Sequence, residues 1–455
     1  MLNNKGFVID KSNLSENEIC DLKTKLTISP IVGDYTPVHL VPKIKVYREG
    51  KKTIRVPRYF GIDNINPEPE INITNGIPID VLFKGVLNDK ISQTEAANKA
   101  LTHLKQIGNG ILSLPTGYGK TTIALYIISK MKTRTMIIVH KHFLLNQWLE
   151  RIRQFLPDAK VGFIQGKNVD VIGKDIVIVM LQSVAMKKYD DNIYDGFGLT
   201  VIDEAHHICA KVFSKALFNI CTKHMLGLSA TPDRKDGLTT ILKWFLNDVF
   251  YYIERKEQQN VIVKKIQLGK EFYGPIPFPM NKLNKVSLPE AINMLTENEI
   301  RNNIIISQIE KELEQENSRN ILILSDRRIH CKLMKENIEN LLRNKCSTKK
   351  VGLYLGGMKP EELKQSEDCD IIIGTYSLAH EGLDIPKLDT LILSTPKSDI
   401  VQSVGRILRE TTTKKNDPLV IDIVDMWGIF EYQYYKRQKF YKKTGFVIKE
   451  SCVNM

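Results

Sequence analysis

Short apolar runs alternate with stretches of helical periodicity along most of the chain. One set lies between about residues 86 and 250: Ile111–Leu114, Thr135–Val139, Ile176–Met180, Leu199–Ile202 and Met225–Leu228. A second set lies between about 300 and 455: Ile321–Leu324, Gly352–Leu355, Asp370–Ile373, Thr390–Leu393 and Leu419–Ile423. Buried runs of this length separated by helices are typical of βαβ units. The pattern therefore predicts two α/β domains, each built on a parallel sheet.

The first 85 residues follow a different pattern. The β-branched runs Lys43–Tyr47 and Thr53–Val56 alternate in polarity, and turn signals occur at Asn66–Glu70 and Asn75-Gly76. Such alternation indicates half-buried strands joined by turns. We therefore expect a β-rich accessory domain at 1–85, an ATP-binding α/β domain at 86–250 and a second α/β domain at 301–455. The proline-containing, mixed-charge segment 251–300 is interpreted as a linker or small insertion.

Composition narrows the class of protein. The 455 residues are 42% hydrophobic and 26% charged, enough to bury a sizeable core. No apolar run reaches the roughly 18–20 residues of a membrane-spanning helix, and the N-terminus has no apolar signal core. We therefore expect an intracellular protein that has no membrane partner. Seven scattered cysteines without a Cys-x-x-Cys pair argue against a zinc ribbon or an iron–sulfur cluster.

The charge balance is basic. Lys and Arg number 65 against 52 Asp and Glu, which gives a net charge of +13. Such an excess favours a polyanionic partner, nucleic acid above all, although charge alone also fits a soluble basic protein.

The segment after Ile111–Leu114 predicts a phosphate-binding loop. It reads Pro-Thr-Gly-Tyr-Gly-Lys-Thr and leads into a helical stretch, Thr122–Lys130. Glycines let backbone N–H groups turn around a phosphate, Lys120 can reach the β/γ-phosphates, and Thr121 can ligate Mg²⁺. The usual first glycine is Leu114 here. The predicted ATP-binding residues are Pro115, Thr116, Gly117, Tyr118, Gly119, Lys120, Thr121 and Thr122.

A second strand, Leu199–Ile202, ends in two acids. Asp203 is expected to hold Mg²⁺ together with Thr121, and Glu204 to orient and deprotonate the attacking water. His206 is expected to connect the nucleotide to the other domain or to nucleic acid. An Asp-Glu pair is also common as a solvated cap, but its place after an apolar strand favours the catalytic interpretation.

Farther along, Gln402, Arg406 and Arg409 recur at a spacing that puts them on one helix face. Such a face can present guanidinium groups to a phosphate, and an arginine finger speeds phosphoryl transfer by roughly 10³–10⁵. The alternative is a solvated basic face.

Together these stretches resemble, in order, the motifs of superfamily 2 helicases of the DEAH-box type. The matching segments are Pro115–Thr121 (motif I), Val139–Trp148 (Ia), Asp203–His206 (II), Ser229–Thr231 (III), Ile321–Asp326 (IV), Ile372–Pro386 (V) and Gln402–Arg409 (VI). The resemblance implies two RecA-like domains and ATP hydrolysis with Mg²⁺. It also implies an adenine-reading role for Gln93 and nucleotide contacts from Gly382 and Asp384. The residues that usually precede that glutamine, one aromatic and one basic, are Ile91 and Ser92 here.

Two further stretches suggest a branch of the superfamily. Gly227–Gly237 resembles the XPB-like DNA translocases, although Lys235 replaces the central acid of their Arg-Glu-Asp element. The strand and Asp-x-x-Asp of Val420–Asp425 are followed by the tail Tyr432–Phe446, in which basic and aromatic residues interleave. This order is similar to that in the transcript-release helicases of poxviruses and their asfarvirus relatives. Such a tail suits phosphate contact and base stacking, and equally a helix that packs its aromatics on the second domain.

The resulting hypothesis is an ATP-driven DNA helicase or translocase acting in viral transcription, located in the host cytoplasm or virion. Its expected partners are DNA and, for that role, RNA polymerase or the nascent transcript complex. Alternatives are a branch-migration or recombination-repair helicase, an RNA helicase, a non-catalytic binding module and the motor subunit of a restriction complex.

Overall fold

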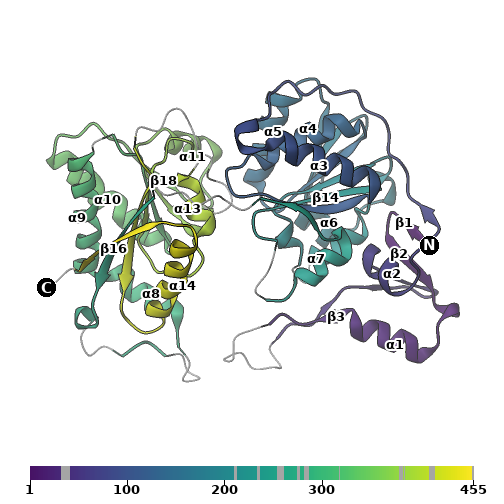
Figure 1. Cartoon of the computed structure of the whole chain (residues 1–455), viewed down its shortest axis with the longest axis horizontal. Helices are drawn as coiled ribbons and strands as arrows, with labels where there is room; N and C mark the ends of the chain where they lie inside the picture. Colours follow the sequence, from purple (N-terminus) through teal and green to yellow (C-terminus); the bar gives the residue numbers. More distant parts are fainter. Residues whose placement is uncertain are drawn as a thin grey trace. The chain divides into compact units, whose positions relative to one another are not determined.

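The computed structural model describes residues 1–31, 41–209, 213–232, 236–253, 261–273, 277–280, 286–316, 318–378, 383, 385–408 and 416–452 (Figure 1). The chain divides into two units, Met1–Glu254 and Arg255–Met455. No helix among these residues is long and apolar enough to cross a membrane.

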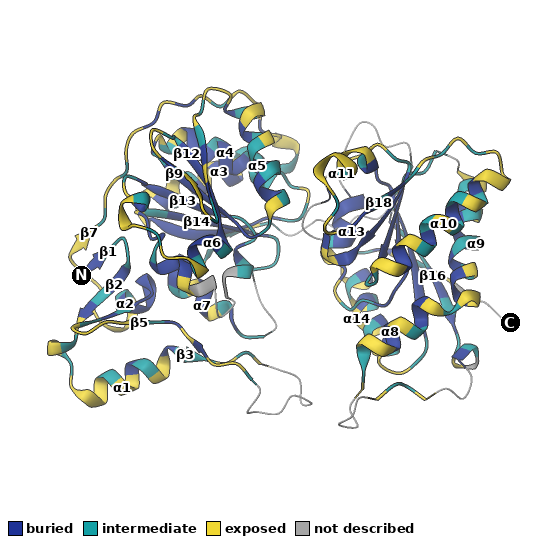
Figure 2. Cartoon of the chain, turned by 180° about the vertical axis from the view of Figure 1, so that it is seen from behind, coloured by how far each residue is buried: buried dark blue, intermediate teal, exposed yellow. Residues whose placement is uncertain are grey.

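The first unit is built on an eight-stranded sheet. Its strand order is β11 (Asn168–Asp170), β10 (Val161–Gln165), β12 (Ile176–Met180), β9 (Thr135–Val139), β13 (Leu199–Ile202), β14 (His224–Ser229), β8 (Asn109–Ser113) and β15 (Val249–Tyr252). All neighbours are parallel except β10 and β11. The central strands are buried on both faces, as a parallel sheet covered by helices requires (Figure 2).

Helices cover both faces of this sheet (Figure 1). Those on one face are α3 (Gln93–Gln106), α4 (Lys120–Met131) and α5 (His142–Phe155). Those on the other are α6 (Leu181–Met186) and α7 (Thr239–Leu246). Each face thus has its own hydrophobic core.

The accessory domain forms part of the first unit. Its five-stranded sheet has the order β5 (Arg48–Glu49), β6 (Thr53–Val56), β2 (Gly6–Asp10), β1 (Leu2–Asn3) and β7 (Ile71–Asn72). It also contains the helices α1 (Glu16–Lys25) and α2 (Arg58–Asn64) and the strand pair β3 (Thr27–Ile28) and β4 (Ile44–Lys45). Phe7 and Phe60 share one hydrophobic core with Phe218 and Phe245 of the α/β domain.

The second unit is built on a seven-stranded parallel sheet. Its strand order is β18 (Val351–Tyr354), β19 (Ile371–Thr375), β17 (Ile321–Ser325), β20 (Thr390–Leu393), β21 (Leu419–Asp425), β16 (Ile262–Leu268) and β22 (Val447–Cys452). Its helices are α8 (Leu288–Glu297), α9 (Glu299–Gln315), α10 (Arg328–Asn344), α11 (Pro360–Glu367), α13 (Val401–Ile407) and α14 (Ile429–Lys443). In α14, Tyr434 and Tyr441 are buried, so these two tail aromatics pack inside the unit.

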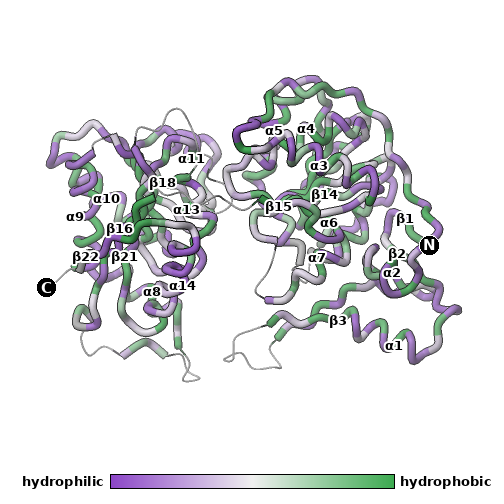
Figure 3. Tube along the Cα trace, viewed as in Figure 1, coloured by the Kyte–Doolittle hydropathy of each residue, from purple (hydrophilic) through white to green (hydrophobic). Residues whose placement is uncertain are grey.

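The predicted fold class, two parallel-sheet α/β domains with a β-rich accessory domain, is confirmed. The hydrophobic strands of the sequence form the centre of each unit (Figure 3). The segment 251–300 supplies strands to both sheets, because β15 reaches Tyr252 and β16 pairs with β21 and β22. The boundaries expected at 85, 250 and 300 stay predictions.

Candidate nucleotide-binding site

The predicted phosphate loop joins the end of β8 to the start of α4. Gly117 and Gly119 have φ values of +83° and +80°, in the left-handed region that favours glycine. A Cβ on Gly119 would lie 2.4 Å from Gln93 Nε2. Leu114 is fully buried, and its N–H donates to Ser229 O at 3.0 Å. The apolar residue at the usual glycine position therefore packs into the core beneath the loop.

Gln93 connects α3 to this loop. Its Nε2 donates to Tyr118 O at 2.8 Å, and its Oε1 accepts from the N–H of Asn88 at 2.8 Å. Both ends of the amide thus hold the loop and the segment before α3 in place. Its reading of an adenine edge stays a prediction.

Lysine and carboxylates meet at one edge of the sheet. Because β13, β14 and β8 are parallel neighbours, their carboxyl ends lie together. Lys120 Nζ lies 3.4 Å from Glu204 Oε1, and both side chains are largely buried. Thr121 follows in the first turn of α4. Glu204 has a φ of +46°, an unusual conformation for a non-glycine residue that occurs at functional sites.

Asp203 is a half-buried member of this cluster. Burial and then the neighbouring Glu204 raise its carboxyl pKa, while a hydrogen bond from Trp148 and the charge of Lys120 oppose the rise. Trp148 Nε1 donates to Asp203 Oδ2 at 2.9 Å, and the N–H of Glu204 donates to Oδ1 at 3.0 Å. Both oxygens are thereby oriented. Such a carboxylate beside Thr121 and a phosphate loop fits the hard oxygen ligands that Mg²⁺ requires.

His206 links the acid pair to the next strand. Its Nδ1 lies 3.5 Å from Glu204 Oε2 and 3.1 Å from Ser229 Oγ. Ser229 ends β14, and its Oγ accepts from the N–H of Thr231 at 3.2 Å. The segments resembling motifs II and III are therefore in direct contact through side chains.

The predicted residues of the second unit are partly described. Gln402 and Arg406 lie on α13, and Arg406 is buried, with Nη1 donating to Leu383 O at 2.7 Å. Gly382, Asp384 and Arg409 lie outside the described residues, as does Lys235 of the segment resembling the XPB-like branch. The roles of all these side chains toward ATP stay predictions.

Sequence reasoning missed the hydrogen bond between Trp148 and Asp203. Trp148 belongs to the segment resembling motif Ia. No pattern in the sequence predicts its contact with Asp203, because the contact depends on β9, which precedes α5, being the neighbour of β13 in the sheet.

Comparison with known proteins agrees with this geometry. Residues 87–234 match the family described as "Type III restriction enzyme, res subunit". The chain is 34% identical over 457 residues to a protein of Acanthamoeba polyphaga mimivirus whose name describes an ATP-dependent RNA helicase. That alignment covers 99% of this chain and 86% of the relative. A similarly named protein of African swine fever virus is 26% identical over 363 residues, which cover 76% of this chain and 70% of the relative.

One solved structure supports the fold alone. It is a fragment of an HsdR subunit of a type I restriction enzyme from Vibrio vulnificus, with a TM-score of 0.55 and 16% identity. The match covers 79% of this chain and 68% of the fragment. The family is shown by the mimivirus relative, whose alignment covers 99% of this chain: the chain belongs to the superfamily 2 ATP-dependent helicases, in a group that has members in large DNA viruses.

Proposed function

We propose that the chain is a translocase that moves on DNA during viral transcription, with transcript release as its task. The observation that carries the motor assignment is the chain of contacts from Lys120 through Glu204 and His206 to Ser229. It joins the phosphate loop to the segment resembling motif III, which couples hydrolysis to strand binding in such helicases. The DNA and transcription assignments are supported by the similarity of the tail to transcript-release helicases.

The side chains divide the chemistry among them. When ATP binds, Lys120 would leave its ion pair with Glu204 and contact the β/γ-phosphates, because a bound polyphosphate is a stronger anionic partner. Glu204, once released, would orient the attacking water and accept its proton. Asp203 and Thr121 would hold Mg²⁺, which neutralises charge developing on the phosphates. In this proposal the second domain contributes its own nucleotide-binding residues, Gln402, Arg406, Arg409, Gly382 and Asp384.

An RNA helicase is the second candidate, because the names of the mimivirus and African swine fever virus relatives describe RNA helicases. The net charge of +13 suits either nucleic acid.

The deciding experiment is steady-state ATPase activity without nucleic acid and with single-stranded DNA, duplex DNA or RNA. Strong stimulation by DNA, abolished by Lys120→Ala and by Glu204→Gln, is expected. Glu204→Gln should still bind ATP, which separates loss of chemistry from loss of binding. Greater stimulation by RNA would replace the DNA assignment, and equal rates in all four conditions would refute coupling between hydrolysis and strand binding.

A further inference from the structure

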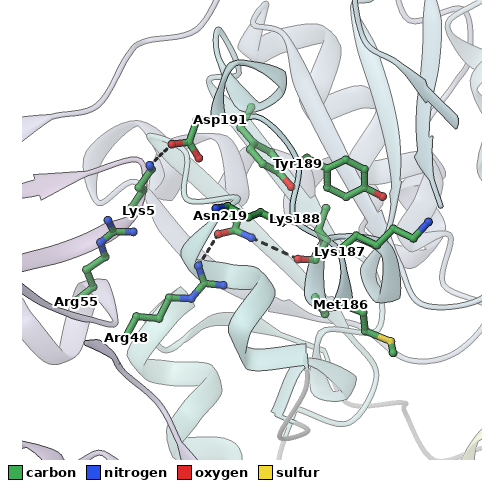
Figure 4. Close-up of a pocket in the computed structure, with 12 residues that line it drawn as sticks. Lys5, Arg48, Arg55, Met186, Lys187, Lys188, Tyr189, Asp191 and Asn219 are labelled. Atoms are coloured by element: carbon green, nitrogen blue, oxygen red, sulfur yellow. Dashed lines mark hydrogen bonds and ion pairs between the residues drawn. The ribbon is translucent and has the colours of Figure 1, made fainter. Parts of the chain in front are cut away.

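A basic pocket lies where the accessory domain meets the first α/β domain (Figure 4). Its cavity volume is about 410 Å³. Lys5, Arg48 and Arg55 enter it from the accessory sheet, and Lys188 comes from the segment after α6. The one carboxylate in the lining, Asp191, forms an ion pair with Lys5. The pocket therefore carries a clear excess of positive charge.

Two of these cations face each other across neighbouring strands. Arg48 of β5 and Arg55 of β6 are directly opposed in an antiparallel pair. Like charges in such a pair are destabilising. Burial and then the charge of Arg55 lower the pKa of Arg48. Among the described side chains, Arg48, Arg55 and Lys188 form no direct ion pair with a carboxylate, although the charges of Arg55 and Lys188 help to lower the pKa of Asp191. One carboxylate faces several cations, so an external anion would relieve the remaining repulsion.

Arg48 is held in its position by neutral groups. Its Nη1 donates to Asn219 Oδ1 at 2.9 Å and its Nη2 to Lys215 O at 2.8 Å. These contacts fix a cation at the pocket without cancelling its charge. In Figure 4, Arg55 and Lys188 extend toward the same region, whereas the ammonium of Lys187 points away from it.

A buried polar atom also lacks a partner here. Tyr194 lines the pocket and is 8% exposed, and its hydroxyl is buried without a hydrogen-bond partner in the described structure. A buried hydroxyl without a hydrogen bond has lost its contact with water and gained nothing in return, which is unfavourable. An oxygen-rich ligand would accept its hydrogen bond.

We propose that this pocket binds a backbone phosphate of the nucleic acid on which the motor acts, outside the helicase motifs. The inference rests on the proposed function, because it presumes a nucleic-acid substrate. Arginine side chains together with a hydroxyl donor suit phosphate oxygens in charge and hydrogen bonding. Because the ligand contacts both domains, its binding strengthens their packing.

The test is fluorescence anisotropy of the full chain with a labelled DNA duplex and a labelled single strand, measured over a range of salt concentrations. Arg55→Gln should lower affinity by roughly fivefold near 0.15 M salt, and flatten the slope of log K against log[salt] by about one. Arg55→Lys keeps the charge and should retain most of the slope. Lys187→Gln is the matched control: Lys187 also lines the pocket, but its ammonium points away, so this substitution should change both quantities much less than Arg55→Gln does.

Tyr194→Phe provides an independent readout. It removes an uncharged donor, so affinity should fall while the salt slope stays the same. Folding of Arg55→Gln is checked by thermal unfolding, where loss of the Arg48–Arg55 repulsion should leave Tm unchanged or higher.

The outcomes separate the two proposals. A wild-type chain that binds no nucleic acid overturns both the proposed function and the pocket. Normal binding with the same slope in wild type, Arg55→Gln and Lys187→Gln overturns the pocket alone. Competition by inorganic tripolyphosphate that Arg55→Gln weakens supports a phosphate site. Preferential competition by polyglutamate would instead indicate an acidic protein partner and overturn the assignment.

Discussion

At the scale of single residues, the hydrogen bond from Trp148 opposes the rise in the pKa of Asp203 that burial and Glu204 cause. The indole N–H is a neutral donor that favours the charged carboxylate, so Trp148→Phe should raise the pKa of Asp203 further. Mg²⁺ binding requires the ionised carboxylate, so activity is present above the pKa of Asp203 and is lost below it. A higher pKa therefore moves this loss of activity to a higher pH. We expect the acid limb of the ATPase pH profile to move up and the Mg²⁺ requirement to increase several-fold.

The matched control is Trp244→Phe, which likewise replaces an indole ring of the first unit with a phenyl ring. Trp244 packs edge-on against Phe60, with ring centroids 5.0 Å apart, and the hydrogen bonds described for Asp203 come from Trp148 and Glu204. It should reduce stability without shifting the pH profile. An unchanged profile in Trp148→Phe would show that its hydrogen bond does not tune the site.

How far the sequence predicts the site depends on the kind of residue. Lys120, Asp203 and Glu204 stand in motifs with fixed spacing after apolar strands, and the structure brings them together. The contacts of Trp148, and the opposition of Arg48 and Arg55, depend on which strands are neighbours and in what register. The spacing of residues along the chain does not specify which strands are neighbours or in what register they pair, so these contacts could be found only from the structure.

At the scale of elements, a buried ion pair fixes α9 to β21 in the second unit. Arg301 donates to Asp425 from Nε at 2.7 Å and from Nη2 at 2.9 Å, and both side chains are fully buried. Asp425→Asn would leave the guanidinium charge buried without its partner, which costs roughly 3–5 kcal/mol. Hydrogen exchange of the α9 and β21 amides should become correspondingly faster.

The matched comparison is Lys345→Ala, which removes the partly exposed pairs of Lys345 with Glu310 and Glu314. Solvent screens exposed pairs, which therefore contribute little to stability, so exchange in the same elements should hardly change. If Asp425→Asn and Lys345→Ala changed amide exchange in α9 and β21 equally, the burial of an ion pair would not determine how strongly it stabilises these elements.

Elements were predictable where the apolar pattern was continuous. β9, β12, β13 and β20 have the same bounds in the structure as in the sequence prediction. β16 was missed because Lys264 and Lys265 interrupt its apolar run. In the folded chain these ammonium groups are paired with Glu312 and Glu450, so a strand carrying two lysines lies between β21 and β22. Tertiary pairing overrode the local pattern.

At the scale of the whole molecule, the accessory domain completes the core of the first motor domain. Arg58 of α2 contacts the eight-stranded sheet, where its Nη1 donates to Asn109 Oδ1 at 3.1 Å and to Lys223 O at 3.0 Å. Phe7 and Phe60 pack in the same core as Phe218 and Phe245. A domain attached only as a recognition module would not share a hydrophobic core in this way.

Deleting residues 1–85 should therefore expose an apolar face and remove the hydrogen bond from Arg58 to Asn109, whose side chain keeps the N–H of Met225 and the carbonyl of Phe245 as partners. We expect the fragment 86–455 to aggregate, since large exposed apolar patches promote association. Size-exclusion chromatography and thermal unfolding of the fragment test this. The full chain carrying Arg58→Ala is the milder comparison, and it should stay monomeric with a lower Tm, because only the polar contacts are lost. A monomeric fragment that unfolds cooperatively at the temperature of the full chain would instead show an accessory domain that is merely tethered to the motor.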